Sequence, residues 1–482
     1  MMWTALQKYS TMFISFISGI ILARLLTPFD YGCIGMLSIF MVLADTFIDG
    51  GFGSALIQKK RPTQEDYSTI FWWNLIVASV MYVILFFSAP IIARFYNTPI
   101  LCAVLRVNGI VLFTHALNLV QRNQLKKKFN FKLLSNVTII VTIVNLSIAI
   151  IMAYSGFGVW ALVAQNIGGS ALYSLIFWFY VKWRPSWVFS WKAFKELFGF
   201  GFYMFLTHLV NDLGGEIQGL LIGKKYNPST MGYYSKAVGT ESLASKSISS
   251  IMTQVTYPLY AEVQDNIVAL SNMVKRLVMT LAYLTFPLMF VLLLCAKPLF
   301  VLLYSDRWLQ SVPYFQVLCF AGLANCLQSA NLMAISAIGK SKTMFVWTLV
   351  KRAVGIGAVV MGMILFGMKG LLTGMIFNSW FSYFVNIGLV SKYIGYTYWR
   401  QILDLLPVAI TSLIAAVVSF GVGHLLHLSM YPDGLLKAGV YAIIYLGWSF
   451  IFKPEAYTYF LTNIPDRFKL FKKLKKNKQQ GY

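Results

Sequence analysis

A stripe of polar residues runs at helical spacing through an apolar stretch near residues 196–223. Its members are His208, Asn211, Asp212, Gly215, Glu216 and Gly219. Steps of three and four residues put them on one face of an α-helix. Two carboxylates one turn apart repel each other, which favours proton uptake by one of them. The stripe therefore predicts an ion-coupling site at His208, Asp212 and Glu216, with a structural polar network as the alternative.

A second acidic pair, Asp45 and Asp49, has the same four-residue spacing and lies beside Gly50, Gly51 and Gly53. One interpretation is a second acidic site or gate facing a cavity. The other is ordinary polarity at a helix end, with the glycines allowing close packing. The pattern slightly favours the second interpretation.

Basic residues inside apolar segments suggest an anionic cargo. Lys236, Glu241 and Lys246 share one predicted helix, but 100° per residue prevents a straight helix from pointing all three into one cavity. We predict Lys246 as a cavity cation, then Lys236, with Glu241 as a partner. Arg24 and Arg106 are further candidates, although both could instead extend to the outer membrane interface. Such cations would bind a phosphate group through charge-assisted hydrogen bonds.

The composition requires membrane-spanning helices to position these residues. Of 482 residues, 58% are hydrophobic and 12% charged, whereas a soluble globular protein carries about 25% charged residues. An ordinary cytosolic enzyme is therefore excluded, and apolar runs of about 18 or more residues predict transmembrane helices. Fourteen spans are predicted near residues 3–26, 33–57, 67–94, 100–122, 133–154, 158–181, 196–223, 229–257, 271–296, 312–338, 343–367, 369–391, 402–427 and 434–452.

The net charge of +24 is interpreted through topology rather than nucleic-acid binding. Lys and Arg concentrate in alternate loops, so the positive-inside rule places both termini in the cytoplasm. The basic tail, residues 453–482, alternates bases with apolar residues and predicts an amphipathic segment on the inner leaflet. A disordered basic tail is the alternative.

An internal repeat relates the two halves of the chain. Thr27-Pro28 with Gly32 recurs as Asn227-Pro228 with Gly232, at an offset of 200 residues. Six spans separate the copies, so the halves are parallel repeats with a site between them near the midplane. The predicted fold is an all-α polytopic membrane protein with two six-helix repeats and two further helices. Its parts are an N-lobe (1–190), a C-lobe (191–395), accessory helices (396–452) and the tail (453–482).

The motifs of several enzyme classes are missing from the sequence. It contains no P-loop, HExxH or GxSxG pattern, and its five cysteines have no paired spacing. The four histidines are too scattered to indicate a metal site. We therefore expect a transporter with no catalytic residue, no metal and no cofactor.

Several segments together resemble a known family. They are Leu22 to Gly32 (LARLLTPFDYG), Leu43 to Thr46 with Asp49 and Gly51, Ile57 to Lys60 (IQKK), Gly232 to Ala237 (GYYSKA), Tyr257-Pro258 and Asp306 to Trp308 (DRW). Their order is similar to Wzx-type polysaccharide-unit flippases of the MOP exporter superfamily, in the colanic-acid exporter branch. The segment before Trp3 is shorter than is usual there, which predicts a start upstream.

The resemblance implies an inner-membrane flippase for an oligosaccharide linked to undecaprenyl pyrophosphate. It further implies alternating access, membrane lipids as partners, H+ or Na+ as coupling ion, and an association with the polysaccharide polymerase and chain-length machinery. Nucleic acid is not an expected partner. A MATE-like multidrug cation antiporter is the main alternative, and a membrane polysaccharide polymerase is a further one. The bases argue against the antiporter, and the short outer loops argue against the polymerase.

Mutation can test the predicted diphosphate site. We expect Lys246→Ala and Arg24→Ala each to abolish complementation of an export-deficient strain, because each would remove a cation from the anion site. Immunoblotting of membranes should show normal protein levels. Full complementation by both variants would contradict these binding assignments.

Overall fold

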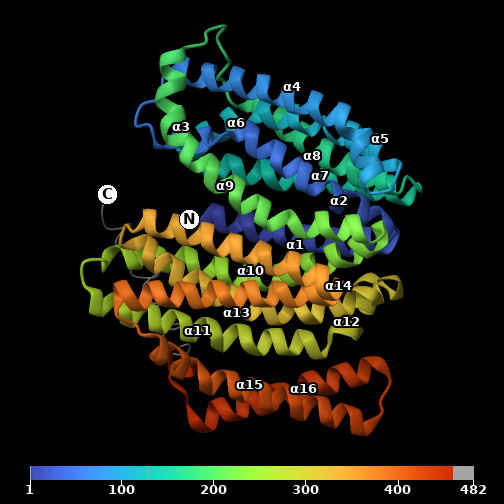
Figure 1. Cartoon of the computed structure of the whole chain (residues 1–482), viewed down its shortest axis with the longest axis vertical. Coiled ribbons are helices and arrows are strands. Elements are labelled where there is room, and N and C mark those ends of the chain that lie inside the picture. The colour runs from blue at the N-terminus through green and yellow to red at the C-terminus, as the bar shows by residue number, and fades with distance from the viewer. Residues whose placement is uncertain (1, 129, 460–482) are drawn as a thin grey trace. The chain divides into compact units, whose positions relative to one another are not determined.

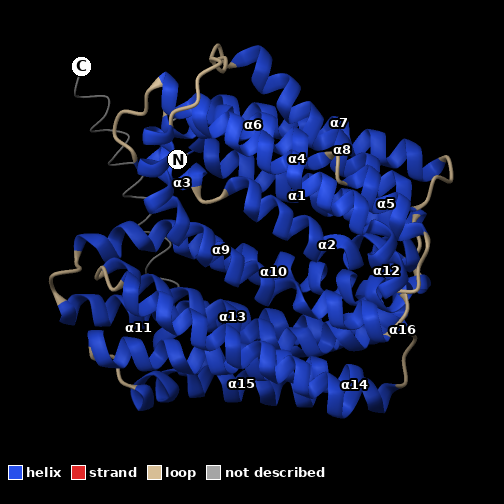
Figure 2. Cartoon of the chain, turned by 45° about the horizontal axis from the view of Figure 1, so that its top comes forward, coloured by secondary structure: helices blue, strands red, loops and turns tan. Residues whose placement is uncertain are grey.

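The computed structural model describes residues 2–128 and 130–459, and these residues are helical with no β-strand (Figure 2). The elements in chain order are α1 (Met2–Leu25), α2 (Pro28–Asp49), α3 (Phe52–Gln58), α4 (Gln64–Phe95), α5 (Ile100–Asn108), α6 (Val111–Lys127), α7 (Phe131–Tyr154), α8 (Val159–Tyr180), α9 (Trp191–Lys225), α10 (Pro228–Glu262), α11 (Ile267–Leu294), α12 (Ala296–Tyr304), the 3₁₀ turn η1 (Asp306–Ser311), α13 (Val312–Ala337), α14 (Ser341–Ile394), α15 (Tyr398–Leu426) and α16 (Met430–Phe452). The predicted all-α class is confirmed.

Ten helical stretches of the described chain are long and apolar enough to cross a membrane, so this is a multi-pass membrane protein. The number of fourteen spans stays a prediction. Several predicted breaks are visible as backbone features. Gly367, with φ 62° and ψ −139°, interrupts α14 between the predicted spans 343–367 and 369–391. Gly50 and Gly51 both have positive φ and separate α2 from α3.

The chain divides into two compact units, described here one at a time (Figure 1). The first unit holds Met1–Lys236 with Leu303–Trp308, and the second holds Ala237–Leu302 with Leu309–Tyr482. Helix α9 belongs to the first unit, where it packs on α2, α3 and α4. The predicted lobe boundary at residue 190 stays a prediction.

Of the apolar clusters that hold the first unit together, two join its most distant segments of sequence. In one, Ala149 and Ala153 of α7 and Ala161 of α8 pack against Leu22 and Leu26. Small residues let neighbouring membrane helices approach closely, which compensates for the weak hydrophobic driving force within lipid. In the other, the buried side chains of α3, α4, α6 and the start of α9 meet; they include Phe52, Leu56, Phe71, Val120 and Leu197. This second cluster positions the helix ends that form the site below.

The two copies of the sequence repeat begin helices in the same way. Thr27 is the N-cap of α2 and forms a capping box with Asp30, and Pro28 follows at the first helical position. In the second copy, the Asn227 side chain accepts a hydrogen bond from the Thr230 backbone at 2.8 Å, ahead of Pro228. The repeat is thus a recurring helix start.

Glycines pack these two helix starts against each other reciprocally. A Cβ on Gly32 would lie 1.7 Å from the Pro228 carbonyl oxygen, and one on Gly232 would lie 1.8 Å from the Pro28 carbonyl oxygen. Because the obstacle is backbone on both sides, no rotation of a side chain can relieve the clash. This reciprocal glycine contact explains why both copies keep Gly at that place.

The second unit is built around α11 and α13, which pack on each other and on α15 and α14. After α16, Glu455 forms an ion pair with Lys275 of α11, with 2.8 Å between Oε2 and Nζ. Lys275 also lies 3.4 Å from Asp404 of α15. One lysine therefore ties the chain just after α16 to two helices.

The reciprocal glycine contact makes a stability prediction. We expect Gly32→Ala to lower the free energy of unfolding by about 1–3 kcal/mol, the usual range for overpacking, in denaturant unfolding of the purified protein. Gly239→Ala is the matched control, because Gly239 lies in α10 with no atom within 4 Å of an added Cβ. Equal stability of the two variants would contradict this account of the contact.

Candidate functional site

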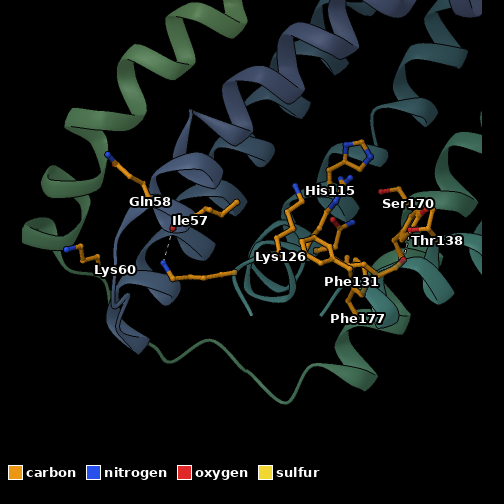
Figure 3. A pocket seen from close by; sticks show the side chains of 14 residues that line it. Ile57, Gln58, Lys60, His115, Lys126, Phe131, Thr138, Ser170 and Phe177 are labelled. Carbon is orange, nitrogen blue, oxygen red and sulfur yellow. Dashed lines mark hydrogen bonds between the residues drawn. The ribbon is translucent and has the colours of Figure 1, made fainter. Parts of the chain in front are cut away.

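A cavity of about 940 Å³ lies within the first unit, bounded by the end of α3 and by α6, α7 and α8 (Figure 3). Its positively charged or protonatable lining residues are Lys60, His115, Arg122, Lys126 and Lys127. Phe131, Tyr173 and Phe177 add aromatic surface. Among the described residues that line this basic cavity there is no carboxylate. Its chemistry therefore suits an anion attached to a larger, partly apolar or sugar-like group.

The periodicity of α6 explains why one helix supplies most of these groups. His115, Asn118, Arg122 and Lys126 follow one another at intervals of three and four residues, so they form a single stripe along the helix. Guanidinium and ammonium groups are the protein's strongest donors to phosphate. A stripe of this kind can contact several phosphate oxygens at once.

A separate pocket of about 240 Å³, the acidic pocket, lies between α2 and α9. It is lined by Asp45, Asp49, His208 and Asp212, together with Thr46. Thr46 Oγ1 donates a hydrogen bond of 2.6 Å to Asp212. The structure thus brings together predicted residues from two helices that are far apart in sequence. Their role in ion coupling stays a prediction.

Glu216 lies farther along α9 and accepts a hydrogen bond of 2.5 Å from Ser38 of α2. Together, Thr46 and Ser38 place one hydroxyl of α2 against each of two carboxylates of α9. Hydrogen bonds of this kind join helices within a membrane. Hydroxyl donors on α2 therefore form a polar network with α9 alongside the acidic pocket, and the choice between ion coupling and a structural role stays open.

Lys236 is buried, with 8% of its surface exposed. Its Nζ donates to the Gly19 carbonyl oxygen at 2.8 Å. It also faces the rings of Tyr304, Tyr31 and Trp308 at 4.1, 4.9 and 5.5 Å. It lines a third cavity of about 330 Å³ with residues of α1, α7 and α8. Lys236 is thus buried beside a cavity different from the basic cavity, and its role in binding the cargo stays a prediction.

The other predicted residues lie elsewhere. Arg24 is exposed at the end of α1, where its Nε donates to the Leu303 carbonyl oxygen at 3.1 Å. Arg106 lies over the Phe86 ring at 4.3 Å and donates to the Phe86 carbonyl oxygen. Neither lines the basic cavity or the acidic pocket.

The two remaining predicted residues are on α10. Glu241 is buried in the second unit, where an added Cβ on Gly322 would lie 2.4 Å from its carboxylate. The Lys246 side chain lies outside the described residues.

Sequence reasoning missed the cations of the basic cavity. The positive-inside rule accounts for Lys60, Arg122, Lys126 and Lys127 as basic residues of cytoplasmic loops, and His115 is one of four scattered histidines. The periodicity of His115, Asn118, Arg122 and Lys126 along one helix was the available signal. It was obscured because the same basic residues also satisfy the positive-inside rule.

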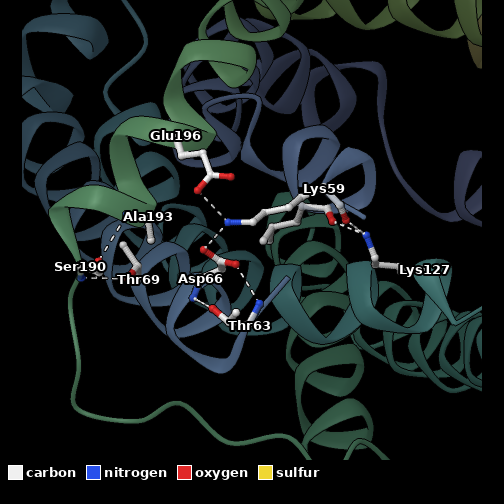
Figure 4. A network of polar contacts seen from close by, with 9 residues as sticks. Lys59, Thr63, Asp66, Thr69, Lys127, Ser190, Ala193 and Glu196 are labelled. Carbon is white, nitrogen blue, oxygen red and sulfur yellow. Dashed lines mark hydrogen bonds and ion pairs between the residues drawn. The ribbon is translucent and has the colours of Figure 1, made fainter. Parts of the chain in front are cut away.

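A polar network lies beside the basic cavity, which Lys127 of the network also lines (Figure 4). Lys127 Nζ donates to the Leu56 and Ile57 carbonyl oxygens at 3.0 Å each, and also to the Lys59 carbonyl oxygen. It therefore satisfies the C-terminal carbonyls of α3. Lys59 in turn bridges Asp66 of α4 at 3.0 Å and Glu196 of α9 at 2.9 Å.

Comparison with known proteins identifies the family. The model of the polysaccharide biosynthesis protein family matches residues 21–313. The chain belongs to this family. Two relatives are the teichuronic acid biosynthesis protein TuaB of Bacillus subtilis, 25% identical with 72% of each chain covered, and the lipopolysaccharide biosynthesis protein WzxC of Escherichia coli, 23% identical with 88% of this chain and 87% of WzxC covered. The predicted resemblance to Wzx-type proteins is confirmed.

Solved structures support the fold of this polysaccharide biosynthesis family member. The lipid II flippase MurJ in an inward closed conformation matches with a TM-score of 0.73 at 15% identity, covering 94% of this chain and 98% of MurJ. An inward-facing multidrug resistance MATE family transporter of the MOP superfamily matches with a TM-score of 0.63 at 15% identity, covering 80% and 94%. The predicted MOP fold is confirmed, but the fold is shared by both structures and does not decide the cargo.

The Lys59 bridge makes a second stability prediction. Burial opposes the charge of Lys59, but hydrogen bonds to Glu196 and Asp66 outweigh burial and raise its pKa. Its stabilisation is thus present below pH 10.5, the ordinary pKa of lysine, and is lost as the pH rises through the higher folded value.

We expect Lys59→Met to be clearly destabilising, because Asp66 is only 2% exposed and would lose its cationic partner. Glu196→Gln should cost at most about 1 kcal/mol, because an exposed ion pair contributes little. Chemical unfolding of both purified variants measures which of them loses more free energy of unfolding. The reverse order would show that Asp66 does not depend on Lys59.

Proposed function

We propose that this protein is a flippase that moves an oligosaccharide linked to undecaprenyl pyrophosphate across the membrane for surface polysaccharide biosynthesis. The family match, the relative named for lipopolysaccharide biosynthesis and the fold shared with a lipid II flippase all support it. The observation that carries the proposal is the basic cavity. Its bases suit a diphosphate, and its aromatic side chains suit the sugars next to it.

The same cavity argues against the main alternative. A multidrug cation antiporter shares the fold, but its cargo carries positive charge. Lys60, Arg122, Lys126 and Lys127 would repel such a cargo, and no described carboxylate in this cavity would offset them. An enzymatic role is also disfavoured, because the two solved structures that share the fold are a flippase and a multidrug transporter.

The finer parts of the proposal concern topology and energy coupling. The protein would lie in the inner membrane with both termini in the cytoplasm, as the distribution of Lys and Arg suggests. Cargo would then enter from the cytoplasmic side, because the lining residues Lys60 and Lys127 put one end of the basic cavity at the loops after α3 and α6. The acidic pocket on α2 and α9 would bind the coupling ion, H+ or Na+. The polymerase and chain-length machinery would receive the product.

Removing cations from the cavity tests the proposal. We expect Arg122→Ala combined with Lys126→Ala to stop export, because each lost charge-assisted hydrogen bond is worth about 1.5–3 kcal/mol, or roughly tenfold or more in affinity. The measurement is accumulation of the lipid-linked repeat unit in a strain that lacks the native gene.

Arg61→Ala is the matched control, because Arg61 is a neighbouring exposed base that does not line the cavity. It should export normally. Normal export by the double variant, at normal protein level in membranes, would refute the assignment of the cavity as the cargo site.

A further inference from the structure

His115 connects the basic cavity and the acidic pocket of the first unit. Its side chain lines the basic cavity (Figure 3). Its Nδ1 lies 2.8 Å from Oδ1 of Asp45 on α2. Asp45 does not line the basic cavity but does line the acidic pocket. The His115–Asp45 pair is therefore a hydrogen-bonded link from one cavity to the other.

The chemistry of imidazole gives this link a direction. Next to an ionised carboxylate, Nδ1 keeps its proton and donates a hydrogen bond to Asp45, because an ionised carboxylate can only accept hydrogen bonds. In neutral histidine, Nε2 is then left with a lone pair, which repels a phosphate oxygen. In the imidazolium form, Nε2 carries a second proton and donates a charge-assisted hydrogen bond. With Nδ1 held by Asp45, only the protonated ring can bind an anion.

We infer that His115 contacts the diphosphate of the cargo only as an imidazolium, so that binding of the headgroup takes up a proton at this residue. This inference rests on the proposed function, since it concerns the same basic cavity. Protonation at Nε2 accompanies binding, and the proton leaves Nε2 when the anion leaves. The acidic partner across the ring, Asp45, stabilises the charged state in between.

Charged groups surround His115 on two sides, and they bear on whether its ring is neutral or an imidazolium. On the basic side, the charged groups that line the cavity with His115 are Lys60, Arg122, Lys126 and Lys127, and the Tyr173 hydroxyl also lines it. On the other side lies Asp45, with Asp49, Asp212 and the second imidazole of His208 in the same acidic pocket. No charged residue of the described parts of α4, α7 or α8 lines either cavity. An incoming diphosphate adds negative charge on the basic side and so tips the balance towards imidazolium.

The test uses the purified full chain in lipid nanodiscs with inorganic pyrophosphate as the probe. Calorimetry in two buffers of different ionisation enthalpy gives the protons taken up per ligand bound, between pH 5.5 and 8.5. Histidine ordinarily changes charge within this range. By linkage, an obligatory proton weakens binding by up to about tenfold per pH unit once the free site is neutral. Ionisation of pyrophosphate itself is common to all variants and cancels in the comparison.

We expect His115→Gln to bind more weakly than the wild type at pH 6 and to take up fewer protons, by up to one per ligand. His115→Lys should keep tight binding. Like His115→Gln, it should also lack the pH dependence that His115 gives the wild type. Asp45→Asn should lower the pH at which tight binding disappears. His424→Gln, on a histidine of α15 outside both cavities, should match the wild type.

Two outcomes separate this inference from the proposed function. If His115→Gln takes up as many protons and binds as tightly as the wild type, the inference about His115 is wrong while the basic cavity stands. If the wild type binds no pyrophosphate, or if Arg122→Ala with Lys126→Ala binds as well as the wild type, the cavity is not a diphosphate site and the inference falls with it.

Discussion

A charged side chain packed among apolar helices needs a partner or a water-filled cavity, and this constraint organises the first unit. Lys236 meets it with a backbone carbonyl and three aromatic rings. Asp212 and Glu216 meet it with hydroxyls of α2. The bases of the basic cavity are gathered instead around a space; among its described residues, Lys127 donates to backbone carbonyls and His115 pairs with Asp45. A group of cations left facing a cavity is the arrangement that an anionic ligand completes.

The fold was largely predictable because its determinants are local. Apolar runs of sufficient length define most helices, and glycines with positive φ mark breaks such as those at Gly50 and Gly367. The repeat was visible because Pro28 and Pro228, with the caps before them, are required to start a helix. The stripe on α9 could also be predicted, because helical spacing fixes which residues share a face.

The basic cavity could not be predicted in the same way. Arg24 and Lys126 are both basic residues next to apolar runs, but one is exposed at a helix end and the other lines a cavity. Only packing of α6 against α3, α7 and α8 separates these cases. Likewise, no local pattern pairs His115 with Asp45, because the contact joins residues 70 positions apart.

The reciprocal glycine contact has a consequence for how the protein can diversify. At Gly32 and Gly232 the neighbour is a main-chain oxygen, so even the smallest side chain is excluded. Such a junction cannot be tuned by small steps in residue size, since even the first added carbon atom meets backbone. Variation in how firmly these two helix starts adhere must therefore come from the caps before them, where Thr27 and Asn227 already differ.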